Sequence, residues 1–235
     1  MSVRLSVIIP VLNESALISA ALASVHSATV APIDVIVVDG GSTDDTVNLA
    51  KQHGAKVIRS ERGRGHQLNV GWRAARGDWC LFLHGDCLLP PRYDERIAAC
   101  LRPAQRQGRG HGLQTWWAAL LSSGVELRTR WLHRPYGDQA LFVRRDVLEA
   151  AGGFKEWPLL EDLELVQRLS RVQPPVIVDG AITTSGRRWQ SVGFLRTSLI
   201  NQVILAGYAL GVSPQVLASW YWGAKQLASR TLQST

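Results

Sequence analysis

The chain has 235 residues, of which 46% are hydrophobic and 19% are charged. This composition is typical of a folded globular protein and argues against a disordered chain or a multispanning membrane protein. The formal net charge is +7, and because most of the basic residues are arginines, anionic ligands such as phosphate groups are expected.

The first hundred residues alternate short β-branched runs with helical patterns, which predicts βαβ units and a mostly parallel sheet of the α/β class. The sequence predicts strands at 5–9, 35–38, 56–59 and 80–84, and helices at 17–25, 43–53, 67–75 and 91–101. Ser42 and Asp45 have the spacing of a capping box, which predicts that the second helix starts beside Ser42.

The pattern changes after residue 102. Residues 103–115 are polar and rich in glycine, so they are expected to form a loop. The sequence then predicts a helix near 116–132, a strand at 140–143, a helix at 160–171 and a strand at 176–178. Residues 1–190 would thus form one domain, with a first half at about 1–102 and a second half at about 103–190.

The C-terminal segment has a different character. Residues 197–224 carry no charged side chain, yet interspersed polar residues and a break at Gly211 to Pro214 predict two moderate helices instead of one membrane span. Three adjacent aromatic residues at 220–222 suit a membrane interface. The alternatives for this appendage, residues 191–235, are packing on the sheet or a homodimer contact.

Several signals concern location and partners. The three cysteines have no C-x-x-C spacing, so they predict neither a disulfide framework nor a zinc site. The N-terminus enters an apolar run at once and lacks the features of a signal peptide. We therefore expect a cytoplasmic protein, either free or peripheral on the inner face of the membrane. The arginines are spread along the chain without an aromatic and basic RNA motif, which argues against a nucleic-acid partner.

Carboxylates stand where the predicted strands end. Glu14 follows the first strand, Asp39 ends the second and Asp86 follows the fourth. Ligands of open α/β sheets bind beyond the carboxyl ends of the strands, so these three side chains are expected to converge at one edge. Gly40 and Gly41 would let the backbone approach a ligand closely, beside the positive end of a helix. Each carboxylate alone would equally suit a structural role in its own turn.

A segment rich in arginine and glycine, residues 59–69, precedes the third helix and suits a pyrophosphate. Its candidate contacts are Arg64, Gly65 and Asn69, and a solvated basic loop is the alternative. It is not a dinucleotide-binding fingerprint, because Leu68 stands at the third glycine position and the segment follows the third strand.

Residues 160–164 are Leu-Glu-Asp-Leu-Glu and begin a predicted helix. Its apolar stripe consists of Leu160, Leu163, Val166 and Leu169. This stripe leaves Asp162 free to point away from the core. Alternatively, the negative charges of Glu161 and Asp162 only stabilise the first turn of this helix through its dipole.

Four of these segments, in this order, resemble the motifs of family 2 glycosyltransferases. They are Val-Ile-Ile-Pro-Val-Leu-Asn-Glu (7–14), Val-Val-Asp-Gly-Gly-Ser-Thr-Asp-Asp-Thr (37–46), Leu-Phe-Leu-His-Gly-Asp (81–86) and Leu-Glu-Asp-Leu-Glu (160–164). Gly-Asp-Gln-Ala-Leu-Phe (137–142) and Thr-Ser-Gly-Arg-Arg-Trp (184–189) extend the resemblance over most of the chain. These two are similar to small bacterial members assigned to arsenosugar-type biosynthesis.

The resemblance implies a GT-A fold, with a mostly parallel sheet flanked by helices. It also implies transfer of a sugar, with inversion, from a nucleotide-diphosphate sugar, by default a UDP-sugar, to an acceptor hydroxyl. The implied donor pocket consists of Pro10, Asn13, Glu14 and Asp39. In that pocket Asp39 would face the base and Glu14 the ribose.

The same resemblance implies that Asp86 holds Mn²⁺ or Mg²⁺. The family usually has Asp-x-Asp here, whereas this chain has His84 at the first position. For His84, a contact with a metal ligand is favoured over direct binding of the metal. One carboxylate with phosphate oxygens and water completes an octahedral site for such hard ions. Asp162 would be the general base for the acceptor hydroxyl. The implied acceptor and diphosphate contacts are Asp138, Gln139, Glu161, Arg187, Arg188 and Trp189.

Two other classes of protein remain open at this point. A sugar nucleotidyltransferase usually has a glycine- and arginine-rich phosphate loop after the first strand, and Pro-Val-Leu-Asn-Glu at 10–14 is not such a loop. A non-catalytic nucleotide-sugar or membrane-surface binding protein would explain His84 and the apolar tail, but the acidic residues Asp39, Asp86 and Asp162 argue against it.

Overall fold

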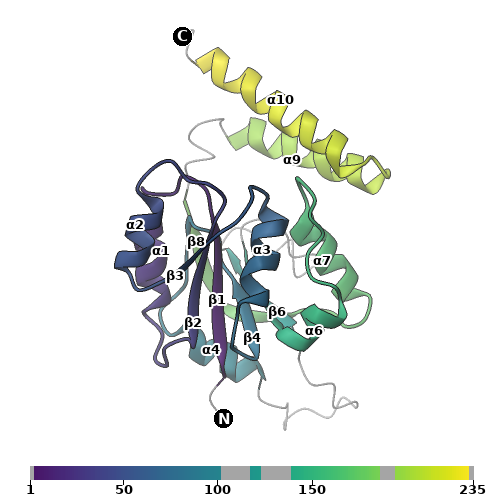
Figure 1. Ribbon diagram of the computed structural model, residues 1–235. Helices are drawn as coiled ribbons and strands as arrows, with labels where there is room; N and C mark the ends of the chain where they lie inside the picture. Colours follow the sequence, from purple (N-terminus) through teal and green to yellow (C-terminus); the bar gives the residue numbers. More distant parts are fainter. Residues whose placement is uncertain (1–2, 102–116, 123–138, 186–193, 233–235) are drawn as a thin grey trace.

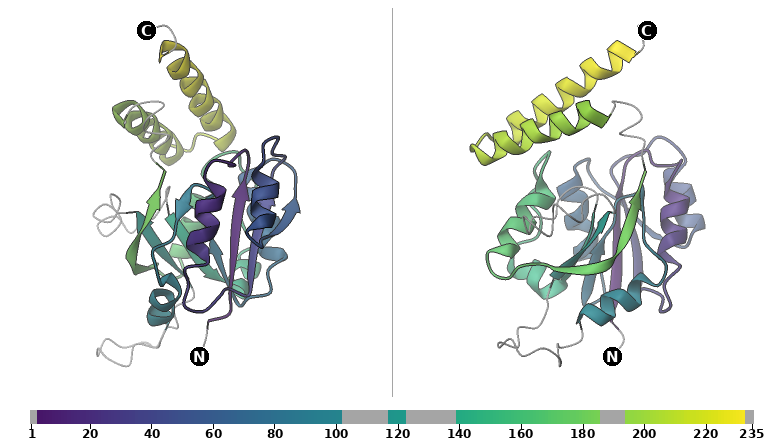
Figure 2. Two further views of the ribbon diagram at one scale, coloured as in Figure 1. Left: turned by 90° about the vertical axis from the view of Figure 1, so that its left-hand side faces the viewer. Right: turned by 180° about the vertical axis from the view of Figure 1, so that it is seen from behind.

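The computed structural model describes residues 3–101, 117–122, 139–185 and 194–232. A central sheet carries helices on both faces, and a pair of helices stands beyond one end of the sheet (Figure 1). The two further views show the same arrangement (Figure 2). This is the α/β architecture that the sequence predicts.

The sheet consists of β1 (Leu5–Val11), β2 (Asp34–Asp39), β3 (Lys56–Arg59), β4 (Trp79–Phe82), β5 (Cys87–Leu88), β6 (Trp117–Ser122), β7 (Gln139–Arg144) and β8 (Val176–Thr184). Their order is β3-β2-β1-β4-β7-β6-β8-β5. The first four strands of this order are parallel, β7 runs antiparallel to both neighbours, and β6 and β8 are parallel. The carboxyl ends of β1, β2 and β4 therefore lie at the same edge.

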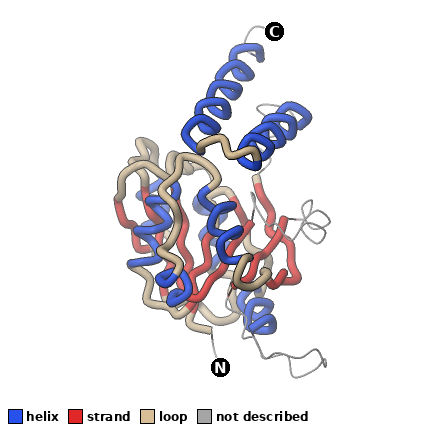
Figure 3. The backbone as a smooth tube through the Cα atoms, turned by 90° about the vertical axis from the view of Figure 1, so that its right-hand side faces the viewer, coloured by secondary structure: helices blue, strands red, loops and turns tan. Residues whose placement is uncertain are grey.

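Two apolar layers enclose the sheet. On one face pack α1 (Ile18–Val25), α2 (Thr46–Gln52) and α4 (Tyr93–Leu101), and on the other α3 (Arg64–Arg73), α6 (Arg145–Ala150) and α7 (Glu161–Ser170). Figure 3 shows helices on both sides of the strands. In β1 the side chains alternate, with Val7 and Ile9 in the first layer and Ile8 in the second. An apolar run in a strand buried on both faces is the expected result.

The C-terminal helices form a hairpin of α9 (Phe194–Ala209) and α10 (Pro214–Leu232). Gly211, with φ of +84°, lies at the predicted break. At Gly207 an added Cβ would lie 2.7 Å from Leu217, so glycine lets the two helices approach closely. Tyr208 connects the hairpin to the domain, because its hydroxyl donates to Gln167 Oε1 of α7 at 3.2 Å. The division of the chain at residue 190 stays a prediction.

None of the helices in the described part of the chain combines the length and apolarity that a membrane span requires.

Some predicted elements were wrong. Residues 117–122 form strand β6 between β7 and β8 instead of the start of a helix, because pairing on both sides overrides the helix preference of Ala and Leu. Helix α2 begins only at Thr46, and Asp45 makes no side-chain cap. Ser42 Oγ instead accepts the N–H of Asn13 at 2.9 Å. Strand β5 and helix α6 were not predicted, and the predicted loop 103–115 lies outside the described residues.

Candidate functional site

Asp39 lies at the carboxyl end of β2 and shapes the turn that follows. Its side chain is buried and accepts the N–H of Ser42 at 3.0 Å and of Gly41 at 3.3 Å. Gly41 has φ of +94°, a conformation that favours glycine. A carboxylate has room for more than two hydrogen bonds, so Asp39 retains acceptor capacity beyond its structural role in this turn.

Asn13 joins the loop after β1 to the loop after β2. It lies in the left-handed region at φ of +54°, which asparagine tolerates better than most residues. Its N–H donates to Ser42 Oγ, and its Oδ1 accepts the N–H of Thr43 at 2.8 Å. Glu14 follows, and its N–H donates to Thr46 Oγ1 at 2.8 Å. The sequence-predicted residues Asn13, Glu14 and Asp39 are thus held at one edge.

Asp44 ties the same two loops together, and sequence reasoning gave it no role. It accepts the N–H of Ser15 at 3.0 Å and both the N–H and the hydroxyl of Thr46. The hydrogen bond from the Thr46 side chain is the largest influence on this carboxyl and holds the pKa of Asp44 well below its ordinary value. Asp44 therefore stays ionised and keeps the edge rigid.

Gln67 is a second residue that sequence reasoning missed. Its Nε2 donates to the carbonyl of Val11 at 2.9 Å and to that of Val38 at 2.8 Å, which joins α3 to the ends of β1 and β2. An added Cβ at Gly40 would lie 3.1 Å from the Gln67 amide, so the turn passes close under the first turn of α3. Its uncharged side chain gave no signal in the sequence.

Asp86 is half-buried on the loop after β4. An added Cβ at the preceding Gly85 would lie 3.2 Å from Val11 Cγ1 and 3.3 Å from Glu14 Cγ, so this loop packs against the loop after β1. Ser185 holds Asp86, because its hydroxyl donates to Asp86 Oδ2 at 3.0 Å and its N–H to the Asp86 carbonyl at 3.1 Å. Sequence reasoning missed Ser185, since the two-residue pairing of β5 with β8 has no sequence signal.

The carboxylate of Asp86 is the predicted metal ligand. Within the described ranges no three His, Cys, Asp or Glu side chains gather into a ready-made metal site. Asp86 Oδ2 carries the Ser185 bond, and His84 lies two residues earlier on the same loop with an interaction of its own. Mg²⁺ commonly takes one or two protein carboxylates and fills its other positions with phosphate and water. Asp86 therefore fits a metal ion that a bound diphosphate helps to hold.

Arg64, at the start of α3, is paired with both acidic residues at the start of α7. Its Nε donates to Glu161 Oε1 and its Nη2 to Asp162 Oδ2, the latter at 3.0 Å. The Glu161 side chain is 2% exposed, whereas those of Asp162 and Arg64 are 24% and 38% exposed. Leu160, at φ of +67°, precedes the helix in the left-handed region. The geometry thus brings Arg64, Glu161 and Asp162 together at the edge that Gln67 and Gly40 share.

Charge and burial act in opposite directions on this trio. Burial lowers the pKa of the Arg64 guanidinium, but the charges of Glu161 and Asp162 outweigh it, so that pKa lies above its ordinary value. Burial also raises the pKa of the Glu161 carboxyl, against the attraction of Arg64.

Asn69 and Gly65 hold the segment before α7. Asn69 is buried, its Nδ2 donates to the Phe154 carbonyl at 2.9 Å, and its Oδ1 accepts the N–H of Phe154 and of the Trp72 indole. An added Cβ at Gly65 would lie 2.3 Å from the Lys155 carbonyl oxygen. These contacts place both residues in the framework beneath the site, and their contact with a donor stays a prediction.

The remaining site predictions fall mostly outside the described residues. Asp138, Arg187, Arg188 and Trp189 lie in undescribed segments, and Gln139 opens β7. Pro10 pairs with Val38 in the β1–β2 ladder, one position before the paired ends of the two strands.

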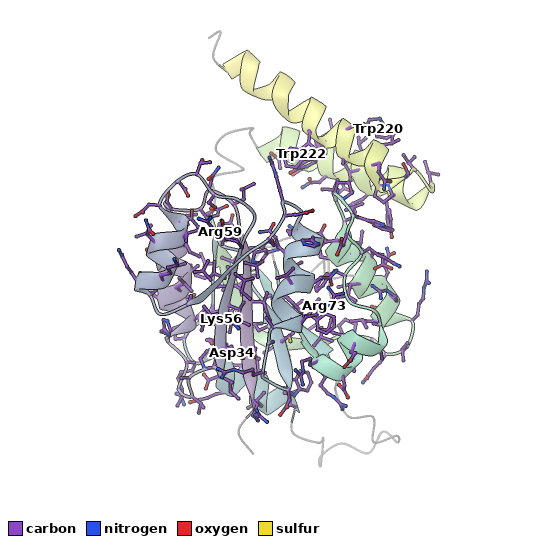
Figure 4. All side chains as sticks on the ribbon, viewed as in Figure 1. Asp34, Lys56, Arg59, Arg73, Trp220 and Trp222 are labelled. Carbon is purple, nitrogen blue, oxygen red and sulfur yellow. The ribbon has the colours of Figure 1, made fainter. Side chains whose placement is uncertain are left out.

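A cavity of about 320 Å³ lies at the opposite end of the sheet. It is lined by Ile33, Asp34, Val35, Gly54, Lys56 and Arg76. Figure 4 places Asp34 far from the hairpin. Asp34 accepts hydrogen bonds from Ser6 and Arg76, so its oxygens are already used within the fold.

Comparison with known proteins gives the class. The family model for glycosyl transferase family 2 matches residues 6–145. The match covers more than half of the chain, and the chain therefore belongs to this family.

Two curated relatives illustrate the sequence similarity. A PGL/p-HBAD biosynthesis glycosyltransferase of Mycobacterium tuberculosis is 36% identical over 88 residues, which is 34% of each chain. An uncharacterized glycosyltransferase of Haemophilus influenzae is 36% identical over 95 residues, covering 39% of this chain and 32% of the relative. The aligned part thus spans about a third of the length of these relatives.

Solved structures agree on the fold. The mannosyltransferase PcManGT of Pyrobaculum calidifontis, in complex with GDP-Man and Mn²⁺, is similar at a TM-score of 0.61 and 18% identity, covering 100% of this chain and 76% of that one. Glucosyl-3-phosphoglycerate synthase of Mycobacterium tuberculosis, in complex with Mn²⁺, UDP and glucosyl-3-phosphoglycerate, is similar at a TM-score of 0.58 and 22% identity. This match covers 81% of this chain and 75% of that one. The fold is that of GT-A glycosyltransferases, as the motifs imply.

Proposed function

We propose that this chain is a metal-assisted, inverting glycosyltransferase that moves a sugar from a UDP-sugar to an acceptor hydroxyl, with Asp162 as the general base. One observation carries the proposal: Arg64 contacts Asp162, and one turn further along α3 Gln67 contacts the strand ends beside Asp39. The predicted base and the predicted nucleoside pocket therefore belong to one contiguous edge, and Asp86 lies beside the same β1 loop.

The donor would lie across the ends of β1 and β2. Asp39, with its remaining acceptor capacity, would receive the base, and Glu14 the ribose hydroxyls, while Pro10, Asn13 and Gly40 shape the pocket. The likeness to structures that hold UDP with Mn²⁺ and GDP-Man with Mn²⁺ supports a nucleotide-sugar donor with a divalent metal.

The diphosphate would lie between Asp86 and Arg64. Asp86 would hold Mn²⁺ or Mg²⁺, with His84 behind it, and such an ion when bound stabilises the charge of a departing diphosphate. Arg64, together with Arg187 and Arg188, would neutralise the phosphate oxygens, since a guanidinium binds them through paired hydrogen bonds.

The transfer step needs one carboxylate on the acceptor side. Asp162 would take the proton of the acceptor hydroxyl as that oxygen bonds to the anomeric carbon, and the bond from this carbon to the diphosphate oxygen breaks on the opposite face. Attack from the opposite face inverts the anomeric centre. Asp138, Gln139 and Trp189 would complete the acceptor side, with the Trp189 ring as an apolar surface for a sugar, while the buried Glu161 would support it through Arg64.

We also propose a peripheral contact of the hairpin with an anionic membrane on its cytoplasmic side. Its exposed apolar side chains are Leu199, Val203, Leu210, Val216, Trp220 and Trp222, and Figure 4 shows both tryptophans on the hairpin. Residues 194–232 include three basic residues, Arg196, Lys225 and Arg230, and no aspartate or glutamate. Exposed aromatic side chains beside basic charge favour an anionic lipid surface.

Vesicle flotation tests this contact. The chain is expected to float with phosphatidylglycerol vesicles but not with phosphatidylcholine vesicles, and Trp220→Ser with Trp222→Ser is expected to abolish flotation. Equal recovery with both lipids, or a stable dimer whose formation needs the same tryptophans, would contradict the membrane contact.

The activity is tested with a panel of nucleotide-diphosphate sugars in the presence of Mn²⁺. Release of UDP that depends on an added hydroxyl acceptor, with a product of inverted anomeric configuration by NMR, is the expected result. Formation of pyrophosphate from a nucleoside triphosphate and a sugar phosphate would instead indicate a nucleotidyltransferase. Nucleotide-sugar binding without turnover of any acceptor, in a correctly folded sample, would favour a binding protein.

A further inference from the structure

Asp162, the base in the proposed function, has both carboxylate oxygens occupied. Oδ2 accepts Arg64 Nη2 at 3.0 Å, and Oδ1 accepts the N–H of Leu163 at 2.7 Å. Each oxygen keeps a second lone pair, but the guanidinium hydrogen at Oδ2 competes with the acceptor hydroxyl, which must come within hydrogen-bond reach of the base. The described arrangement therefore holds the base in a state paired with Arg64.

Arg64 is equally engaged. Its guanidinium donates to Asp162 and to Glu161, so two carboxylates share one cation. The proposed function assigns this guanidinium to the diphosphate, whereas here its Nη2 group points to Asp162. Movement of the guanidinium toward a phosphate oxygen would weaken its contact with Asp162, so the phosphate and Asp162 compete for Arg64.

The two carboxylates around Arg64 differ in a way that favours one direction of movement. Glu161 is almost fully buried at 2% exposure, whereas Asp162 is 24% exposed and Arg64 is 38% exposed. Breaking the pair with Glu161 would leave a buried charge without its partner, which is costly. The partly exposed pair with Asp162 is the weaker one.

We propose that Arg64 is an exchange residue that couples donor binding to release of the base. When the diphosphate binds, Arg64 Nη2 would donate to a phosphate oxygen instead of to Asp162 Oδ2. The hydrogen bond from Nε to Glu161 would persist, so the guanidinium would rotate about this contact. Asp162 Oδ2 would then be free to accept the proton of the acceptor hydroxyl. The base is thereby released only when the donor is in place. This inference rests on the proposed function, and Arg64 acts in it as a positioning residue for Asp162.

Competition for Arg64 gives a test that does not need turnover. Asp162→Asn removes the charge that competes with the diphosphate, so UDP with Mn²⁺ is expected to bind roughly threefold to tenfold more tightly by calorimetry, the effect of releasing a partly exposed ion pair. Uridine, which has no phosphate, is expected to bind with unchanged affinity. In an Arg64→Gln background the substitution at Asp162 is expected to have no effect on UDP.

Glu164→Gln is the matched control. Glu164 lies on the same helix and its Oε2 pairs with Arg168 Nη2 at 2.7 Å, so the substitution removes the same charge without releasing Arg64. Its UDP affinity is expected to equal that of the unmodified chain. Circular dichroism and thermal unfolding would verify that every variant is folded.

Three outcomes overturn the exchange. Unchanged or weaker UDP binding in Asp162→Asn, while the unmodified chain binds UDP, contradicts it and leaves the proposed function standing. Equal tightening in Glu164→Gln, or for uridine, shows a general charge effect and also contradicts it. If the unmodified chain binds no nucleoside diphosphate with any metal, the proposed function fails, and the exchange fails with it.

Discussion

The two ends of the central sheet use aspartate and arginine in different ways. At the amino end the Asp34 side chain is 5% exposed. Its carboxylate accepts hydrogen bonds from the Arg76 Nε and from the Arg76 backbone N–H, both at 2.8 Å, and from the Ser6 hydroxyl at 2.9 Å. At the carboxyl end Asp86 is half-buried, and the Asp162 side chain, which pairs with Arg64, is 24% exposed. The Asp34 carboxylate is closed off from solvent and holds the fold together, whereas Asp86 and Asp162 are partly exposed and can be reached by a ligand.

The largest expected effect concerns turnover at the carboxyl end. Asp162→Asn is expected to lower turnover by roughly 10²- to 10⁴-fold, the usual contribution of a general base. Glu164→Gln, two residues further along α7, is expected to retain turnover within about a factor of three, because Glu164 pairs with Arg168 away from Arg64. UDP release under saturating donor measures both. Comparable losses in the two variants would show that charge on α7, and not Asp162, matters.

The amino end is expected to affect stability alone. Asp34→Ala removes three hydrogen bonds and leaves the buried Ser6 hydroxyl short of a partner, so we expect the free energy of unfolding to fall by about 2–4 kcal/mol. Urea unfolding measures this loss. UDP affinity of the folded fraction is expected to stay unchanged, and a large change in that affinity would break the distinction between the two ends.

A smaller effect is expected beneath the site at Gly65. An added methyl group would meet the Lys155 carbonyl oxygen at 2.3 Å, so Gly65→Ala is expected to destabilise the fold by about 1–3 kcal/mol. Gly223→Ala is the control, because a Cβ there meets no atom within 4 Å and alanine suits a helix better than glycine. Thermal unfolding of the two variants compares them, and equal melting temperatures would contradict the close packing at Gly65.

The smallest expected effect is a pH dependence. Burial acts to raise the pKa of Asp34, but hydrogen bonds from Arg76 and Ser6 outweigh it and lower that pKa in the folded state. The carboxylate therefore stabilises the fold fully above its unfolded pKa of about 3.9, and this contribution is lost as the pH falls through the lower folded value. In urea unfolding between about pH 6 and pH 3, Asp34→Asn is expected to lose less stability than the unmodified chain. An equal loss of stability in the variant and in the unmodified chain over this pH range would contradict this role of Asp34.

The first half of the fold was predictable because local and global signals agree there. Strand β3 has the predicted bounds, and β1, β2 and β4 differ from prediction by about two residues at their ends. The β-branched runs of β1 and β2 are buried on both faces, and each is followed by a polar turn. Such agreement makes strand positions readable from sequence alone.

The second half depends on pairing between distant segments. Strand β6 contains alanine and leucine, which favour a helix, and it is a strand because β7 and β8 flank it. In the site, the sequence indicated Asp39 and Asp86 but not Gln67 or Ser185. Their roles come from contacts across long sequence separations, with Val11 and Asp86 respectively, and neither side chain carries a charge that would single it out.

Binding of a nucleoside diphosphate with Mn²⁺ tests the central claim most directly. The purified chain is titrated calorimetrically with UDP and GDP, with Mn²⁺ and with chelator, beside Asp86→Ala. The account predicts that one nucleoside diphosphate binds in a Mn²⁺-dependent manner and that Asp86→Ala weakens this binding by roughly tenfold to a hundredfold or more. Equal binding with chelator and in Asp86→Ala would contradict the metal site, and no binding of either nucleotide would contradict the donor site itself.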